Sequence, residues 1–137
     1  MQDISRFGTL SARILLSLVF LASGGMKIAA WSMIVGVAAS KGLPLPAFSI
    51  GVAAAIEIIG ALFLLSGFHA RLAAFVLFLY LIPTTLIFHN FWAVQGVEHQ
   101  MQMVNFLKNL AIMGGLLMVA SDGPGPISID KQAANPY

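Results

Sequence analysis

Glu57 is the residue whose type and position most strongly suggest chemistry in this sequence. It lies near the centre of the apolar stretch GVAAAIEIIGALFLLS, residues 51–66. Its neighbours at helical spacing are small: Ala53, Ala54, Gly60 and Ala61. Small residues allow helices to approach closely, and a carboxylate at membrane depth must find a partner or take up a proton. We therefore expect Glu57 to face another polar group inside a bundle of helices.

Polar residues recur at helical spacing in the other apolar stretches as well. One stripe comprises Arg13, Ser17, Phe20, Gly24 and Lys27; a second comprises Gln102, Asn105, Lys108 and Asn109; Thr85 and His89 form a third. A polar stripe on a helix in lipid is expected to turn towards the bundle interior. The ligand-binding residues predicted from this pattern are Glu57, Lys108, Asn109, His89, Lys27 and Arg13.

The expected chemistry is hydrogen bonding or proton transfer in a hydrated or ligand-filled cavity. In this hypothesis Glu57 and Lys108 act at an oxygen of a lipophilic molecule, His89 and Asn109 complete the cavity, and Lys27 lies at its mouth. Structural alternatives remain for the charged residues. Glu57 and Lys108 could form an ion pair that fixes helix register, Arg13 could bind lipid phosphates or cap the inner end, and Lys27 could extend to the interface.

Metal and thiol chemistry are not expected. The sequence contains no cysteine, and Glu57, His89 and His99 lack the spacing of a recognisable metal site. The net charge of +2 is small and dispersed, so nucleic acid is not an expected partner. No catalytic residues are predicted.

The elements that must position these residues are membrane-spanning helices. Hydrophobic residues make up 59% of the 137 residues and charged residues 9%, against roughly 25% charged residues in a soluble domain. Four apolar stretches, residues 9–29, 46–67, 70–91 and 101–121, each approach the ~20 residues that cross a bilayer. We therefore expect an all-α, polytopic, antiparallel four-helix bundle forming a single domain over residues 1–137.

The connections refine this prediction. Apolar residues in 31–40 recur at helical spacing, which favours a short interfacial helix over an extended loop. The short link at residues 67–71 makes the second and third helices antiparallel neighbours. An even number of spans puts both termini on one side, and basic residues on that side place it in the cytoplasm: Arg6, Arg13, Arg71 and Lys131.

These features together resemble the DoxX family of small bacterial inner-membrane proteins. The matching motifs, in order, are S-G-G-M-K (23–27), K-G-L-P (41–44), A-I-E-I-I-G (55–60), G-F-H-A-R (67–71), F-H-N-F-W (88–92), F-L-K-N-L-A-I-M-G-G-L-L (106–117) and D-G-P-G-P-I-S-I-D (122–130). The resemblance implies a four-helix subunit in a bacterial inner membrane, often in a respiratory or redox setting. It supplies no catalytic residues.

The first functional hypothesis is an accessory subunit of a membrane oxidoreductase system that binds a quinone-like or other lipophilic molecule. Its expected partners are the bilayer and oxidoreductase subunits, and it needs no intrinsic cofactor. An enzyme acting alone is disfavoured because no redox group is visible. The alternatives are a small carrier for a lipophilic or weakly acidic solute, and a structural scaffold. A scaffold, or a homo-oligomer, would use small-residue contact points at Gly24-Gly25 and Gly114-Gly115.

Overall fold

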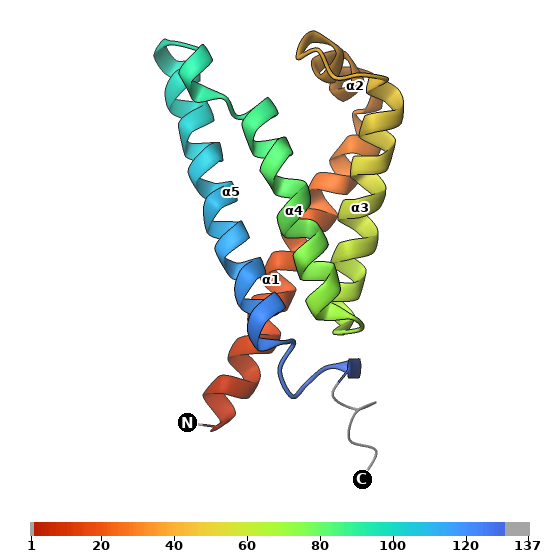
Figure 1. Ribbon diagram of the computed structural model, residues 1–137, viewed down its shortest axis with the longest axis vertical. Helices are drawn as coiled ribbons and strands as arrows, with labels where there is room; N and C mark the ends of the chain where they lie inside the picture. The colour runs from red at the N-terminus through yellow and green to blue at the C-terminus, as the bar shows by residue number, and fades with distance from the viewer. Residues whose placement is uncertain (1, 131–137) are drawn as a thin grey trace.

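A computed structural model describes residues 2–130, with side chains from Arg6 onward. Four helices are long and apolar enough to cross a membrane (Figure 1): α1 (Gln2–Ala29), α3 (Pro46–Ser66), α4 (Ala70–Phe88) and α5 (Gly96–Asp122). A short helix, α2 (Trp31–Ser40), follows α1, and a single 3-10 turn, η1 (Phe91–Ala93), connects α4 to α5. The predicted all-α membrane fold with a short additional helix is confirmed. Lys131, used in the predicted orientation, lies outside the described residues.

Local sequence explains where the central helices begin and end. Pro46 occupies the first turn of α3, where its missing N–H costs nothing. Gly67 ends α3 with φ 71°, a left-handed conformation that glycine adopts readily. α5 begins at Gly96, five residues before the predicted start at residue 101. The prediction missed residues 96–100 because they are too polar to be recognised by hydropathy.

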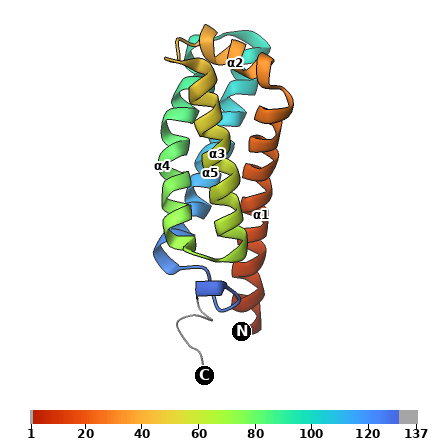
Figure 2. The ribbon, with the colours of Figure 1, turned by 90° about the vertical axis from the view of Figure 1, so that its right-hand side faces the viewer.

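The four long helices form two pairs that diverge towards one end. α1 packs mainly against α3, and α4 packs mainly against α5, while the contact between α3 and α4 joins the pairs (Figures 1 and 2). α1 approaches α5 closely at Gly115, where an added Cβ would lie 3.2 Å from the Leu16 side chain. Beyond this point α1 and α5 separate towards the end that carries α2 and η1.

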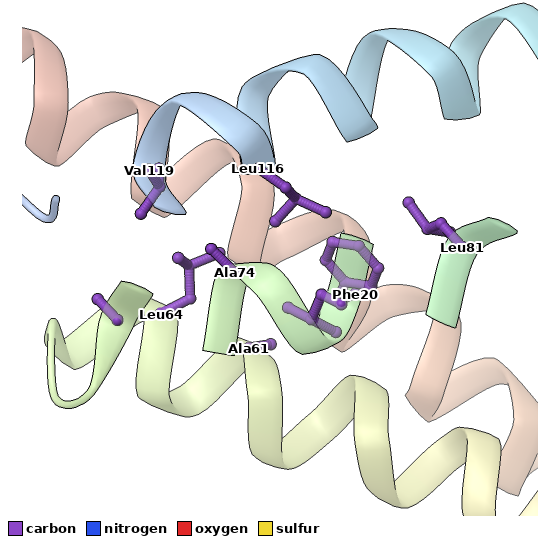
Figure 3. Packing of buried hydrophobic residues seen from close by; sticks show 9 residues of the cluster. Phe20, Ala61, Leu64, Ala74, Leu81, Leu116 and Val119 are labelled. Atoms are coloured by element: carbon purple, nitrogen blue, oxygen red, sulfur yellow. The ribbon is translucent and has the colours of Figure 1, made fainter. Parts of the chain in front are cut away.

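The hydrophobic core lies in the half of the bundle where the two pairs meet. Its side chains come from all four long helices and point towards one another (Figure 3). The cluster comprises Phe20, Ala61, Leu64, Ala70, Ala74, Leu77, Leu81, Leu116 and Val119. Because this half is closely packed, space for a ligand is expected in the other half, between the diverging pairs.

Residues 123–130 close the packed end. The Asp130 carboxylate accepts hydrogen bonds from the backbone N–H groups of His69 (2.8 Å) and Ala70 (3.0 Å) at the start of α4. The Asp130 N–H donates to the Gly67 carbonyl at 3.0 Å. Arg13, in α1, donates from Nη2 to the Ile127 carbonyl at 2.6 Å. This segment is therefore held to α1 and to the α3–α4 connection.

Replacing the Asp130 carboxylate should weaken this closure. We expect Asp130→Ala to lower the free energy of unfolding by about 1 kcal/mol, because it removes the acceptor that caps the first turn of α4. Asp122→Ala is the matched control, since among the described residues only its neighbour Ser121 donates to the Asp122 carboxylate. Denaturant titration in mild detergent provides the comparison, and equal stability of the two variants would contradict the capping role.

Candidate ligand-binding site

Glu57 is the centre of a hydrogen-bonded network inside the bundle. Its side chain is almost fully buried, with 2% of its surface exposed. The Lys27 ammonium group contacts both carboxylate oxygens, Oε1 at 3.0 Å and Oε2 at 2.9 Å. Ser23 Oγ donates to Oε1 at 3.1 Å, and Tyr80 OH donates to the same oxygen at 2.8 Å. The buried carboxylate is thus paired with a cation and hydrogen-bonded, which a charge at membrane depth requires.

The spacing of residues on α1 brings the network together. Ser23 and Lys27 are one turn apart, and Lys27 Nζ also donates to Ser23 Oγ at 2.9 Å. Gly24, between them, allows α1 to approach α3: an added Cβ would lie 2.7 Å from Ile58 Cγ1 and 3.3 Å from Glu57 Cβ. An added Cβ at Gly25 meets nothing within 4 Å. The two glycines of the predicted contact point therefore have different surroundings.

Tyr80 is a member of the network that the sequence reasoning missed. It comes from α4, and the next turn of the same helix is held by Thr84, whose Oγ1 donates to the Tyr80 carbonyl at 2.8 Å. Tyrosine in membrane proteins is enriched at the bilayer interfaces. The position of Tyr80 in the middle of an apolar span could have indicated a role in the site, because a hydroxyl at that depth needs a hydrogen-bond partner.

A cavity of about 510 Å³ adjoins the network. This volume lies within the roughly 300–1,000 Å³ typical of small-molecule sites. The lining is mostly apolar, and its polar side chains are Ser23, Lys27, Ser49, Glu57, Tyr80, Thr84, His89 and Asn109. Leu43, Pro44 and Phe88 line the part nearest the end that carries α2 (Figure 1). Apolar walls with a few convergent polar groups are suited to a lipophilic molecule with a polar oxygen.

A family model described as DoxX matches residues 8–90, more than half of the chain. The chain belongs to the DoxX family. Residues 8–90 include Ser23, Lys27, Glu57 and Tyr80, so the whole Glu57 network of this DoxX-family protein lies in the matched region. All of α5 lies beyond it.

Full-length similarity extends to two Escherichia coli (strain K12) proteins. Inner membrane protein YphA is 34% identical over 123 residues, covering 90% of this chain and 88% of YphA. Inner membrane protein YqjF is 33% identical over 135 residues, covering 96% and 95%. The Saccharomyces cerevisiae ER-derived vesicles protein ERV29 is 30% identical over 77 residues, which cover 56% of this chain and 25% of ERV29. No solved structure matches the chain.

The structural alternative of an ion pair between Glu57 and Lys108 was wrong. Lys27 forms the ion pair, and Lys108 is exposed on α5 and does not line the cavity. The physical reason is the pairing of the helices: α1 packs closely on α3 through Gly24, while α5 packs on α4. The spacing of polar residues along a helix predicts a polar face, but it carries no information on which helices are neighbours.

The other predicted residues divide between the two ends of the bundle. His89 lines the cavity, and its Nδ1 lies 2.9 Å from Gln102 Oε1. Asn109 also lines the cavity and donates from Nδ2 to Thr85 Oγ1 at 2.9 Å. Arg13 is buried, with 1% of its surface exposed, but it lies at the packed end against Ile127. The structure therefore brings Lys27, Glu57, His89 and Asn109 around one cavity and leaves Arg13 and Lys108 outside it.

Removing the Tyr80 hydroxyl should measure its hydrogen bond to Glu57. We expect Tyr80→Phe to lower the free energy of unfolding by about 1.5–2 kcal/mol, because a hydrogen bond to a charged group is lost while the ring is kept. Thr84→Val is a useful comparison, because Thr84 Oγ1 donates to the neutral Tyr80 carbonyl and its removal leaves the hydrogen bond from Tyr80 to Glu57 in place. Denaturant titration of both variants checks the difference, and a smaller loss in Tyr80→Phe than in Thr84→Val would contradict it.

Proposed function

We propose that this DoxX-family protein binds a lipophilic molecule carrying a polar oxygen in the cavity beside Glu57. The observation that carries the proposal is an apolar cavity of about 510 Å³, next to a buried, fully paired ionic network, within a membrane-spanning bundle. Polar residues at membrane depth around a cavity are typical of ligand or proton pathways.

The donors in the network suit a ligand with a carbonyl or hydroxyl oxygen. Lys27 Nζ and Tyr80 OH both point to the Glu57 carboxylate and both line the cavity, so either can be shared with a ligand oxygen. Glu57 can accept a hydrogen bond or a proton in return. A quinone-like molecule fits these residues, and such a ligand is consistent with an accessory subunit of a membrane oxidoreductase system. In that role the partner subunits supply the electrons, and this chain positions the ligand.

A second candidate function is a carrier for a lipophilic or weakly acidic solute. One feature favours it: the cavity extends towards the end that carries α2, while residues 123–130 close the opposite end through Arg13 and Asp130. Release of residues 123–130 would open the packed end of the bundle, so that the cavity could be reached from both sides of the membrane. Solute flux in vesicles, lost on mutation of Glu57, distinguishes a carrier from a binding subunit.

The proposed location is a bacterial inner membrane with both termini in the cytoplasm. The similarity to the inner membrane proteins YphA and YqjF supports this choice of membrane. The orientation follows from the basic residues at the packed end, among them Arg6, Arg13 and Arg71.

Native mass spectrometry of gently extracted protein tests the binding function. The variant is the double substitution Lys27→Met/Glu57→Gln, which removes both charges together and so avoids an unpaired buried charge. Lys41→Met is the control, because Lys41 is exposed and donates to Asn90 outside the lining. We expect the wild-type protein and Lys41→Met to retain the same lipophile. The double variant should retain at least tenfold less of it. Wild-type protein without a specific adduct, or equal retention in all three, would contradict the proposal.

A further inference from the structure

Lys108 is an exposed cation in the middle of a membrane-spanning helix. It lies twelve residues after Gly96, roughly 18 Å along the helix axis, too far for its side chain to reach that end of α5. Within the described part of the chain it has no hydrogen bond or ion pair. A charge at this depth is costly unless an anion or water meets it. Lys108 therefore requires a partner that the described residues of this chain do not supply.

The helix register shows what Lys108 faces. It lies seven residues before Gly115, so the two residues share one face of α5, and Gly115 packs against Leu16 of α1. Because α1 and α5 run antiparallel, the residue of α1 level with Lys108 is seven residues after Leu16, namely Ser23. Ser23 donates to Glu57, so Lys108 is level with the Glu57 network.

At this level α1 and α5 have already diverged (Figure 1). Residues on both helices line the cavity here: Ser23 on α1, and Asn109 and Ile112 on α5. Asn109 is next to Lys108 in sequence and Ile112 is one turn further on. Lys108 is therefore at the α5 edge of the opening between the two helices, with the cavity behind it.

The charges at this level do not balance. Glu57 is held by Lys27, so that pair contributes no net charge. The other carboxylates whose side chains the structure describes, Glu98, Asp122 and Asp130, lie at the ends of helices or in the closing segment. Lys108 leaves an excess of one positive charge, and the described residues of a second copy offer no free carboxylate at the same depth to neutralise it.

We propose that Lys108 binds the carboxylate of a single-chain amphiphile whose tail occupies the cavity. The inference rests on the proposed function and specifies the charge of its ligand. The volume of about 510 Å³ suits one chain rather than the two of a phospholipid. Apolar side chains line the way from the Glu57 level towards α2, among them Ile34, Leu43 and Ile87. The head group would lie between Lys108 and Asn109, with the tail along this apolar part.

Binding of oleic acid and of oleyl alcohol, followed by native mass spectrometry, tests the proposal. The two probes share a tail and differ in the charge of the head group. We expect the wild-type protein to retain at least tenfold more oleic acid than oleyl alcohol. Lys108→Gln should lose this preference and keep its oleyl alcohol binding, while Lys108→Arg should keep the preference. Both variants remain foldable, because the Lys108 side chain packs against nothing in the core.

The outcomes separate this inference from the proposed function. Equal retention of both probes by the wild-type protein, or an unchanged preference in Lys108→Gln, overturns the carboxylate site and leaves lipophile binding intact. Binding of neither probe overturns the single-chain carboxylate ligand, while retention of another lipophile by the gently extracted protein keeps the proposed function. Phosphatidylglycerol, which has two chains, serves as a third probe. Its preferential retention over oleic acid overturns the single-chain ligand. A dimer that is lost in Lys108→Gln would instead identify this face as an interface between copies.

Discussion

Glu57→Gln is expected to lower the free energy of unfolding by about 3 kcal/mol. The substitution keeps the shape of the side chain but leaves the Lys27 ammonium group without its anion in a largely buried position. Removing one partner of a buried ion pair typically costs about 3–5 kcal/mol, and the lower value applies here because Lys27 is partly accessible from the cavity. Denaturant titration in mild detergent measures the loss.

Second substitutions identify the partner of Glu57. Lys27→Met added to Glu57→Gln should restore most of the lost stability, because both charges then leave the interior together. Lys108→Met added to Glu57→Gln should leave the Lys27 charge unpaired and restore much less, because Lys108 forms no pair with Glu57. The reverse order of rescue would show that Lys108, and not Lys27, is the ionic partner.

Gly24→Leu is expected to be the most disruptive single substitution in α1. A side chain there would collide with Ile58 and with the Cβ of Glu57, forcing α1 away from α3. Overpacking of this kind costs about 1–3 kcal/mol, and the separation would also lengthen the Lys27–Glu57 contact. The expected result is a loss of about 3 kcal/mol or more in unfolding free energy, together with loss of the bound lipophile.

Gly25→Leu is the matched control for Gly24→Leu. It adds the same side chain one residue along the same helix, where an added Cβ meets nothing within 4 Å. We expect a change of no more than about 0.5 kcal/mol, as for other substitutions away from packed contacts. If the two glycine variants were equally stable, the close approach of α1 to α3 would be disproved.

Most of the fold was predictable because membrane insertion imposes a simple rule. Each span must be apolar and helical over its whole length, so hydropathy alone located all four long helices. The segment 31–40 was also predicted correctly as a short helix, from the helical spacing of its apolar residues. The start of α5 was placed too late, because residues such as Glu98 and Gln100 belong to the helix without being apolar.

The binding site was only partly predictable from sequence. The inward-facing α1 stripe is confirmed by the burial of Arg13, Ser17 and Phe20. The ionic partner of Glu57 was not predicted correctly, because Lys27 and Lys108 lie near its level and only the packing of the helices decides between them. The close approach of α1 to α3 at this level requires a residue without a Cβ, which Gly24 provides. The adjacent Gly25 and the similar pair Gly114-Gly115 show that a small residue does not itself reveal which way it faces.

The central claim is that the cavity beside the Lys27–Glu57 pair holds a lipophilic ligand. Its most direct test is an experimental structure of the protein extracted with its surrounding lipids in nanodiscs. We predict continuous elongated density in the cavity, with one end within hydrogen-bonding distance of Lys27, Glu57, Tyr80 or Lys108. A cavity that contains only separated water peaks, or that is closed by protein side chains, would contradict the claim and leave a structural role for the ionic network.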